Sequence, residues 1–138
     1  MKNRMLLAFS LVFICFLISG CQLKDSSNLE DEGIFKVSIS PSIGFGNVNT
    51  DFFAEFNDEH NLEIFNNIIS NAVLEKGIVN MAEPEFDIEI TFSNGNKQGY
   101  HLWVSENGQQ STLMKIENTH IIYSIPKEMT NQLIPIVK

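Results

Sequence analysis

The chain has 138 residues, which is enough for one ordinary domain with a hydrophobic core but short for two. Hydrophobic residues make up 43% and charged residues 19%, a globular rather than a disordered composition. The net charge of −8 disfavours a nucleic-acid partner, and two cysteines exclude a disulfide scaffold.

The first 20 residues have the pattern of a signal peptide. Lys2 and Arg4 supply positive charge, and residues 5–18 are apolar except for Ser10. Such a run is too short to span about 30 Å of hydrocarbon, which takes about 20 residues. It fits the apolar region of a secretory signal, so we expect residues 1–20 to direct export.

Residues 18–21, Ile-Ser-Gly-Cys, resemble the lipobox of bacterial lipoproteins. The resemblance implies cleavage between Gly20 and Cys21 and a diacylglycerol thioether on Cys21. Two acyl chains anchor a protein stably without a transmembrane helix. We therefore expect a lipid-anchored protein on the extracytoplasmic face of the plasma membrane, with the bilayer as a partner. The alternative is an ordinary secretory signal or an uncleaved anchor, in which Cys21 has no such role.

Residues 21–33 comprise this cysteine and a polar, acidic stretch with few large apolar groups. This composition is typical of a flexible tether. A single domain is then expected over residues 34–138. The negative charge of the chain favours a position away from anionic headgroups.

Alternating apolar residues, bounded by turn residues, predict strands in most of this domain. The expected strands cover residues 34–40, 52–56, 86–92, 98–105, 111–117 and 119–125. Residues 41–50 contain two glycines and a proline and predict a loop. Asn94-Gly95 predicts a hairpin turn in which both residues have positive φ.

Helical apolar spacing predicts a helix that begins after Asn57 or Asp58 and ends at Lys76-Gly77. Pro126 is expected to open a second helix that ends near Leu133. The fold class is then α+β: an antiparallel sheet of about five to six strands with two helices packed on one face.

The alternation also points a histidine-flanked tryptophan away from the core. Core-facing positions are expected at Tyr100, Leu102 and Val104. His101 and Trp103 then lie on the outer face, and His120 is expected there from the last strand. Together these three side chains suggest a patch for a partner. The alternative, which we favour, is that a loop or a helix covers this face and that these residues only pack there.

No motif for catalysis, a metal or a cofactor is recognised. An alternating acidic row is expected to be a solvated strand face rather than an acid–base pair: Glu83, Glu85, Asp87 and Glu89. Gly44-Phe45-Gly46 lacks the downstream residues of a phosphate-binding loop. The three histidines lack metal-ligand spacing. We therefore expect no catalytic residue, no metal site, no cofactor and no enzymatic activity.

Five short segments carry a family pattern: residues 77–81 (Gly-Ile-Val-Asn-Met), 84–86 (Pro-Glu-Phe), 100–103 (Tyr-His-Leu-Trp), 113–114 (Leu-Met) and 119–125 (Thr-His-Ile-Ile-Tyr-Ser-Ile). They resemble the YhfM-like lipoprotein domain of Bacillus and relatives over most of residues 34–134. The resemblance implies a small lipid-anchored protein of a Gram-positive envelope. It carries over no activity and no site residue.

We expect a surface lipoprotein with a non-catalytic domain that binds an envelope protein or a wall component. Two alternatives stay open. The domain could be a small-ligand or metal carrier, or an enzyme, whose site forms only in the fold. It could also be an accessory subunit of a larger envelope complex.

Overall fold

The computed structural model describes residues 33–76 and 80–138. The expected signal peptide at 1–20, the lipid-anchor site at Gly20 and Cys21, and all but the last residue of the tether at 21–33 lie outside the described residues. So do the first three residues of the first family segment, 77–79.

Seven strands form one antiparallel sheet in the described chain, where five to six were expected. They are β1 (Ile34–Pro41), β2 (Ala54–Phe56), β3 (Val73–Leu74), β4 (Phe86–Phe92), β5 (Lys97–Trp103), β6 (Ser111–Lys115) and β7 (Ile122–Ile125). Their order across the sheet is β2-β1-β4-β5-β6-β7-β3. The run from β4 to β7 is a meander, as the sequence pattern predicts.

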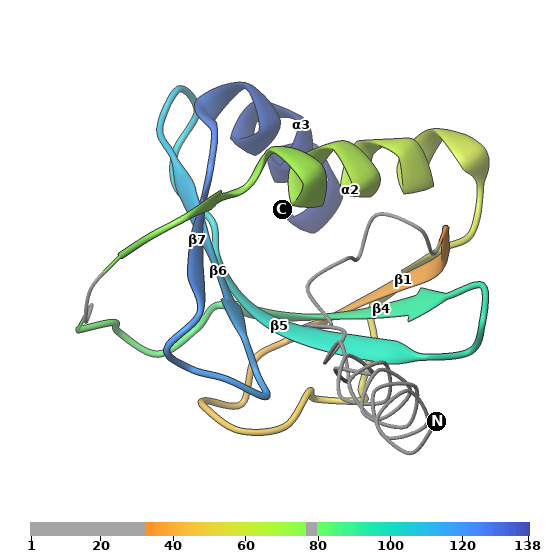
Figure 1. The fold of residues 1–138 in the computed structure, drawn as a ribbon. Coiled ribbons are helices and arrows are strands. Elements are labelled where there is room, and N and C mark those ends of the chain that lie inside the picture. Colours follow the sequence, from red (N-terminus) through yellow and green to blue (C-terminus); the bar gives the residue numbers. More distant parts are fainter. Residues whose placement is uncertain (1–32, 77–79) are drawn as a thin grey trace, which may run out of the picture.

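The two helices lie on the same face of this sheet (Figure 1), which we call the helix face. They are α2 (Glu59–Asn71) and α3 (Lys127–Val137). The fold class is therefore α+β, as expected. The core between the layers joins apolar side chains of both helices to those of the strands, among them Val37, Ile39, Phe65, Ile88, Ile90, Leu102, Ile125 and Leu133.

Helix α2 is shorter than its apolar spacing suggests. It begins after Asp58, whose carboxylate accepts the Asn61 N–H at 3.1 Å. The Asn61 side-chain amide also donates to this carboxylate, and that bond, followed by the backbone bond, lowers the pKa of Asp58. The helix ends at Asn71 because Ala72 is extended and the next two residues pair with β7 as β3. The predicted end at Lys76-Gly77 is wrong because pairing with the sheet overrides local helical spacing.

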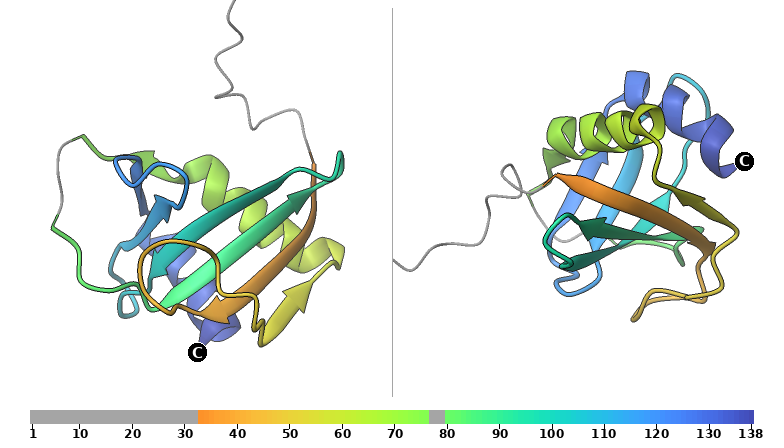
Figure 2. Two further views of the ribbon diagram at one scale, coloured as in Figure 1. Left: turned by 90° about the horizontal axis from the view of Figure 1, so that it is seen from below. Right: turned by 90° about the vertical axis from the view of Figure 1, so that its right-hand side faces the viewer.

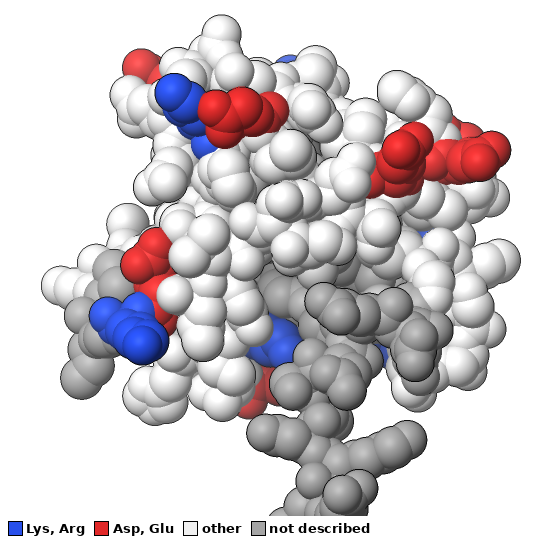
Figure 3. Space-filling model, turned by 45° about the horizontal axis from the view of Figure 1, so that its top comes forward, with Lys and Arg blue, Asp and Glu red and all other residues white. Residues whose placement is uncertain are grey.

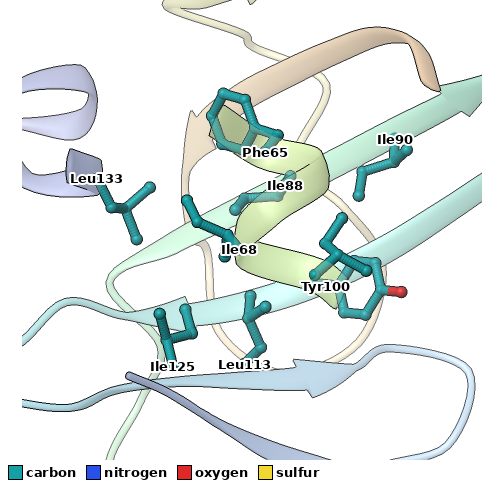
Figure 4. Close-up of a pocket in the computed structure, with 9 residues that line it drawn as sticks. Phe65, Ile68, Ile88, Ile90, Tyr100, Leu113, Ile125 and Leu133 are labelled. Atoms are coloured by element: carbon teal, nitrogen blue, oxygen red, sulfur yellow. The ribbon is translucent and has the colours of Figure 1, made fainter. Parts of the chain in front are cut away.

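Packing between the layers leaves only a small gap in this part of the core. A void of about 10 Å³ lies among nine residues of the helices and strands, eight of which are labelled in Figure 4. Such a space holds about one water molecule. Because its lining is apolar, including Phe65, Ile88 and Leu133, we assign it to imperfect packing rather than to a ligand site.

Charged side chains on the helix side are scattered. On the face in Figure 3, basic and acidic residues form small separate groups rather than one continuous area. Lys127 and Glu128 of α3 form an exposed ion pair, with 3.9 Å between Nζ and Oε1. Within the described residues, no helix has the length and apolar content needed to cross a membrane.

Strand β1 departs from the expected half-buried pattern. The alternation of Phe35, Val37 and Ile39 with polar residues predicts that Ser38 and Ser40 face solvent, yet both are 0% exposed. The same alternation predicts Phe35 in the core, but a shift in register between Ile34 and Lys36 leaves it 61% exposed.

Residues 42–53 cover the face of the sheet opposite the helices (Figure 2), which we call the loop face. Ser40 is buried under this loop and bonds to Asn49 O, whereas Ser38 Oγ donates to Glu55 Oε1 of β2 at 3.0 Å.

The hairpin between β4 and β5 also differs from the prediction. Its loop has three residues, Ser93 to Gly95, since the Phe92 N–H donates to Asn96 O at 2.9 Å. Gly95 has φ of 87°, whereas Asn94 does not have positive φ. This combination is typical of a type I turn followed by a glycine bulge, and not of the expected two-residue turn.

Candidate functional site

Residues 42–53 form a shaped loop between β1 and β2. Gly44 and Gly46 have φ of 106° and 130°, conformations that favour glycine over any residue with a Cβ. Asn49 closes the turn, since its side-chain amide donates to Pro41 O at 2.9 Å and its Oδ1 accepts the Asp51 N–H at 3.1 Å. The sequence of residues 42–49, Ser-Ile-Gly-Phe-Gly-Asn-Val-Asn, thus specifies a definite backbone path.

The loop approaches β5 closely at Gly99. A Cβ at this position would lie 2.7 Å from Val48 Cγ2 and 3.1 Å from Ile116 Cδ1. Val48 therefore takes the space that a side chain on the strand would fill. Glycine at position 99 allows the loop to rest on the sheet.

Beneath the loop, one row of cross-strand neighbours runs over five strands. In register order the row is Ser40, Asp87, His101, Met114 and Ile122. All five side chains are buried. Its polar members lie at the β1, β4 and β5 end, directly under the loop (Figure 2).

Asp87 and His101 form a buried pair. Asp87 Oδ1 lies 2.7 Å from His101 Nδ1, and both side chains are 0% exposed. Asp87 was expected on a solvated acidic face, and that prediction is wrong for this residue because the loop seals it from water. The neighbouring acids differ: Glu83 and Glu85 are exposed, and Glu89 accepts a bond from Lys97 at 2.8 Å.

The loop backbone bonds directly to this pair. The Asn49 N–H donates to Asp87 Oδ2 at 2.8 Å, and the Gly46 N–H donates to His101 Nε2 at 3.3 Å. Ser40 Oγ adds a bond to Asn49 O at 2.6 Å. Because Nε2 accepts a bond, the ring proton lies on Nδ1 and is donated to the carboxylate. The geometry therefore corresponds to an ionised Asp87 and a neutral His101.

Two aromatic side chains lie over and beside the histidine. The Phe45 ring lies 5.7 Å from that of His101 and 6.1 Å from that of Trp103. Trp103 is half-buried, and its Nε1–H is shared between Ala82 O and Glu83 O at 3.0 and 3.1 Å. His101 and Trp103 lie on the loop face, away from the helices as expected, and loop residues cover the histidine, as in the alternative that the sequence favours.

Apolar side chains remain exposed above these contacts. Ile43 is 78% exposed and Phe45 is 52% exposed. We call Ile43, Phe45 and the half-buried Trp103 the loop surface. Contiguous exposed apolar side chains, unlike single scattered ones, are typical of contact sites.

His120 does not join this surface. It is exposed in the turn before β7, where its N–H donates to Asn118 Oδ1 at 3.2 Å. The strand begins only at Ile122, so that residue, and not His120, stands in the row with His101. The structure thus brings together two of the three predicted patch residues. Asp87, Phe45 and Gly46 are the contacts that sequence reasoning missed.

While the loop covers the Asp87–His101 pair, few chemical roles are available to this site. Within residues 33–76 and 80–138, no three side chains of the metal-binding types cluster together. The Asp87–His101 pair resembles half of an acid–base arrangement, in which a carboxylate orients an imidazole. However, its Nε2 is engaged by the Gly46 backbone and not by a nucleophile.

Comparison with known proteins adds a family and a fold. A family model described as "YhfM protein" matches residues 45–138. Among solved structures, the crystal structure of a thioesterase-like protein from Clostridium sporogenes ATCC 15579 is similar, with a TM-score of 0.57 and 15% sequence identity. The match covers 77% of this chain and 94% of that chain, and at this identity it concerns the fold alone. Among curated proteins, none matches this chain.

Proposed function

The chain belongs to the YhfM family, and from this premise we propose a lipid-anchored, non-catalytic domain that binds an envelope protein through the loop surface. The anchor would be Cys21, with the domain on the extracytoplasmic side of a Gram-positive plasma membrane. The observation that carries the binding role is the exposure of Ile43 and Phe45 on a loop whose backbone is fixed from below.

The anchoring part of the proposal is supported by the lipobox resemblance at residues 18–21. Replacing the cysteine tests it, because the thioether needs the Cys21 sulfur. We expect Cys21→Ala to leave the precursor unprocessed or to release the protein from membranes in cell fractionation. Unchanged membrane retention together with an unchanged mass would contradict the anchor.

The binding part is supported by preorganisation. An apolar side chain contributes more to binding when its backbone does not have to be ordered on contact. The loop around Ile43 and Phe45 meets this condition, since bonds from Gly46 and Asn49 hold it on the sheet. A partner on the loop surface would bury Ile43 and Phe45 beside Trp103, and tryptophan is enriched at the centres of interfaces.

The position of the loop favours a protein partner over the anchoring bilayer. The described chain enters β1 at Ile34, whereas the loop begins after Pro41 at the other end of this eight-residue strand (Figure 2). Eight extended residues span about 26 Å. The loop therefore begins at the opposite end of β1 from Ile34, where the expected tether joins the domain.

Crosslinking in living cells tests this role. We expect a photoreactive amino acid in place of Ile43, in the full-length protein, to give a discrete adduct with an envelope protein. The same probe in place of Asn66, an exposed position on α2, is the matched control and should not give it. Phe45→Ser in the Ile43-probe chain should abolish the adduct. Equal adducts from both probe positions, or none from position 43, would overturn the proposal.

A second candidate function comes from the buried Asp87–His101 pair. If the loop opens, His101 Nε2 becomes available as a base or as a ligand, so a carrier or an enzyme is the alternative. A ligand that binds the folded state raises the melting temperature. A thermal-shift panel of divalent metals and wall fragments tests this, and a rise that His101→Asn abolishes would favour it over the non-catalytic role.

A further inference from the structure

We propose that His101 is a pH-sensitive latch for the loop. The neutral imidazole holds residues 43–47 on the sheet, and a second proton on the ring releases them. This inference rests on the proposed binding role and deepens it, because the latch places Phe45 and hence the loop surface. The partner would then meet an ordered surface at neutral pH and a loosened one in acid.

The geometry allows one pattern of protons. His101 Nδ1 donates to Asp87 Oδ1 at 2.7 Å, and Nε2 accepts the Gly46 N–H at 3.3 Å. The second carboxylate oxygen is occupied by the Asn49 N–H at 2.8 Å. Both ring nitrogens and both carboxylate oxygens are thus engaged. Any pattern with a proton on Nε2 places two donors against each other at the Gly46 contact.

A second proton therefore changes the contact from attractive to repulsive. Since the ring is 0% exposed, the proton enters from solvent when the loop opens transiently, and it binds at Nε2. Neither that N–H nor the Gly46 N–H can accept, so the loop cannot close again as before. The imidazolium is retained because Asp87 stabilises it across the 2.7 Å bond. Acid consequently shifts the equilibrium between the closed and the open loop towards the open form.

Release is confined to the tip of the loop. Asn49 bonds to the carboxylate and not to the ring, so its contact with Asp87 survives the second proton. The Phe53 N–H also stays bonded to Ile39 O at 3.0 Å in the flanking chain. The segment that moves is the one that carries Ile43 and Phe45.

Few other charged groups face the ring. Strand β4 contributes Asp87 and, further along the same face, Glu89, which is paired with Lys97 of β5. The neighbours from β6 and from the loop, Met114 and Phe45, do not titrate. Ser40 of β1 is uncharged, and Asp51, the acidic residue of the loop, is exposed to solvent. The other two histidines, His60 and His120, are exposed.

Amide exchange on the full chain in detergent micelles tests the latch. Between pH 8 and 5, the range in which histidines change charge, we expect the protection factor of the Gly46 amide to fall at least tenfold. The Phe53 amide should keep its protection. Trp103 emission should change in parallel, since its ring lies 6.4 Å from that of His101. The His60→Gln/His120→Gln variant should behave like wild type.

His101→Asn is the decisive variant, because its amide can donate to Asp87 but cannot reach Gly46. We expect low Gly46 protection and constant Trp103 emission at every pH. Should this variant not fold, the ring nitrogen shifts of the wild type decide, with Nε2 bare at pH 8 and protonated at pH 5. Constant Gly46 protection in wild type, or a proton on Nε2 at pH 8, would reject the latch.

Crosslinking from position 43 at pH 8 separates the two proposals. An adduct combined with constant Gly46 protection rejects the latch and keeps the binding role. A fall in protection without any adduct rejects the binding role and keeps the latch.

Discussion

The two faces of the sheet are covered by different kinds of interaction. On the helix face, side chains such as Phe65, Leu102 and Leu133 pack without polar partners. On the loop face, Ser40, Asp87 and His101 are equally buried but bonded to the backbone of a single loop. Apolar packing depends on contact area, whereas hydrogen bonds depend on direction and protonation. The first face therefore maintains the fold, and the second determines where a loop lies.

The largest expected effect comes from opening the helix face. Phe65 of α2 is 1% exposed, and its ring lies 5.9 Å from that of Phe56. Phe65→Ala should lower the free energy of unfolding by about 3–5 kcal/mol, because it removes buried area and leaves a cavity. Urea unfolding measures the loss. Asn66→Ala, at the exposed neighbouring position, should change it by less than about 0.5 kcal/mol.

A smaller loss is expected from the loop face. In Asp87→Asn, the amide can accept one bond but must donate the other, while both Asn49 and His101 donate to the carboxylate. One donor stays unpaired, at a cost of about 1–3 kcal/mol. Urea unfolding should show this loss with an unchanged slope, together with altered Trp103 emission in the native state. A loss as large as that of Phe65→Ala would mean that the loop face also maintains the fold.

The close approach at position 99 allows the loop to be displaced by a substitution that leaves Asp87 and His101, which bond to the loop backbone, unchanged. Gly99→Ala places a methyl group 2.7 Å from Val48 Cγ2, so the loop must lift or the side chain must turn. We expect about 1 kcal/mol of destabilisation, at the low end for overpacking. Gly46 protection should fall. Gly33→Ala, where the nearest atom lies at an ordinary 3.4 Å, is the control and should leave that amide protected.

The helix face could be predicted from sequence because its pattern is local. Alternation places Ile88 and Ile90 in the core, and the same rule places Tyr100 and Leu102 there. Strand β3 could not be found in this way. Its two residues continue the apolar spacing of α2, and only the pairing of Val73 with Ser124 makes them a strand.

The sequence favours a loop or a helix over the outer face, as found, but the Asp87–His101 pair beneath it was missed because it depends on register across a turn. A two-residue turn at Asn94-Gly95 would place Asp87 opposite Leu102. The three-residue loop places it opposite His101. The sequence contains a clue, since Ile88 and Leu102 can share the core only if the hairpin has an odd number of loop residues. No local sequence pattern indicates that residues 42–53 fold over the Asp87–His101 pair.

The smallest expected effect is a change of stability with pH. It depends on how each face accommodates a buried ionisable side chain. The loop face retains an ionised Asp87, whereas burial on the helix face raises the pKa of the Tyr100 hydroxyl above its ordinary value of about 10. A raised pKa means that folding favours the protonated form. Its contribution is therefore complete below about pH 10 and is lost as pH rises further, because only the unfolded chain ionises readily.

Tyr100→Phe removes that dependence. Relative to wild type, the variant should lose less unfolding free energy between pH 9 and 11, as measured by urea unfolding at each pH. Parallel losses in both proteins would show that the Tyr100 hydroxyl ionises in the folded protein as readily as in the unfolded chain. In that case the helix face would tolerate a buried charge, and the contrast drawn between the apolar helix face and the hydrogen-bonded loop face would be wrong for the helix face.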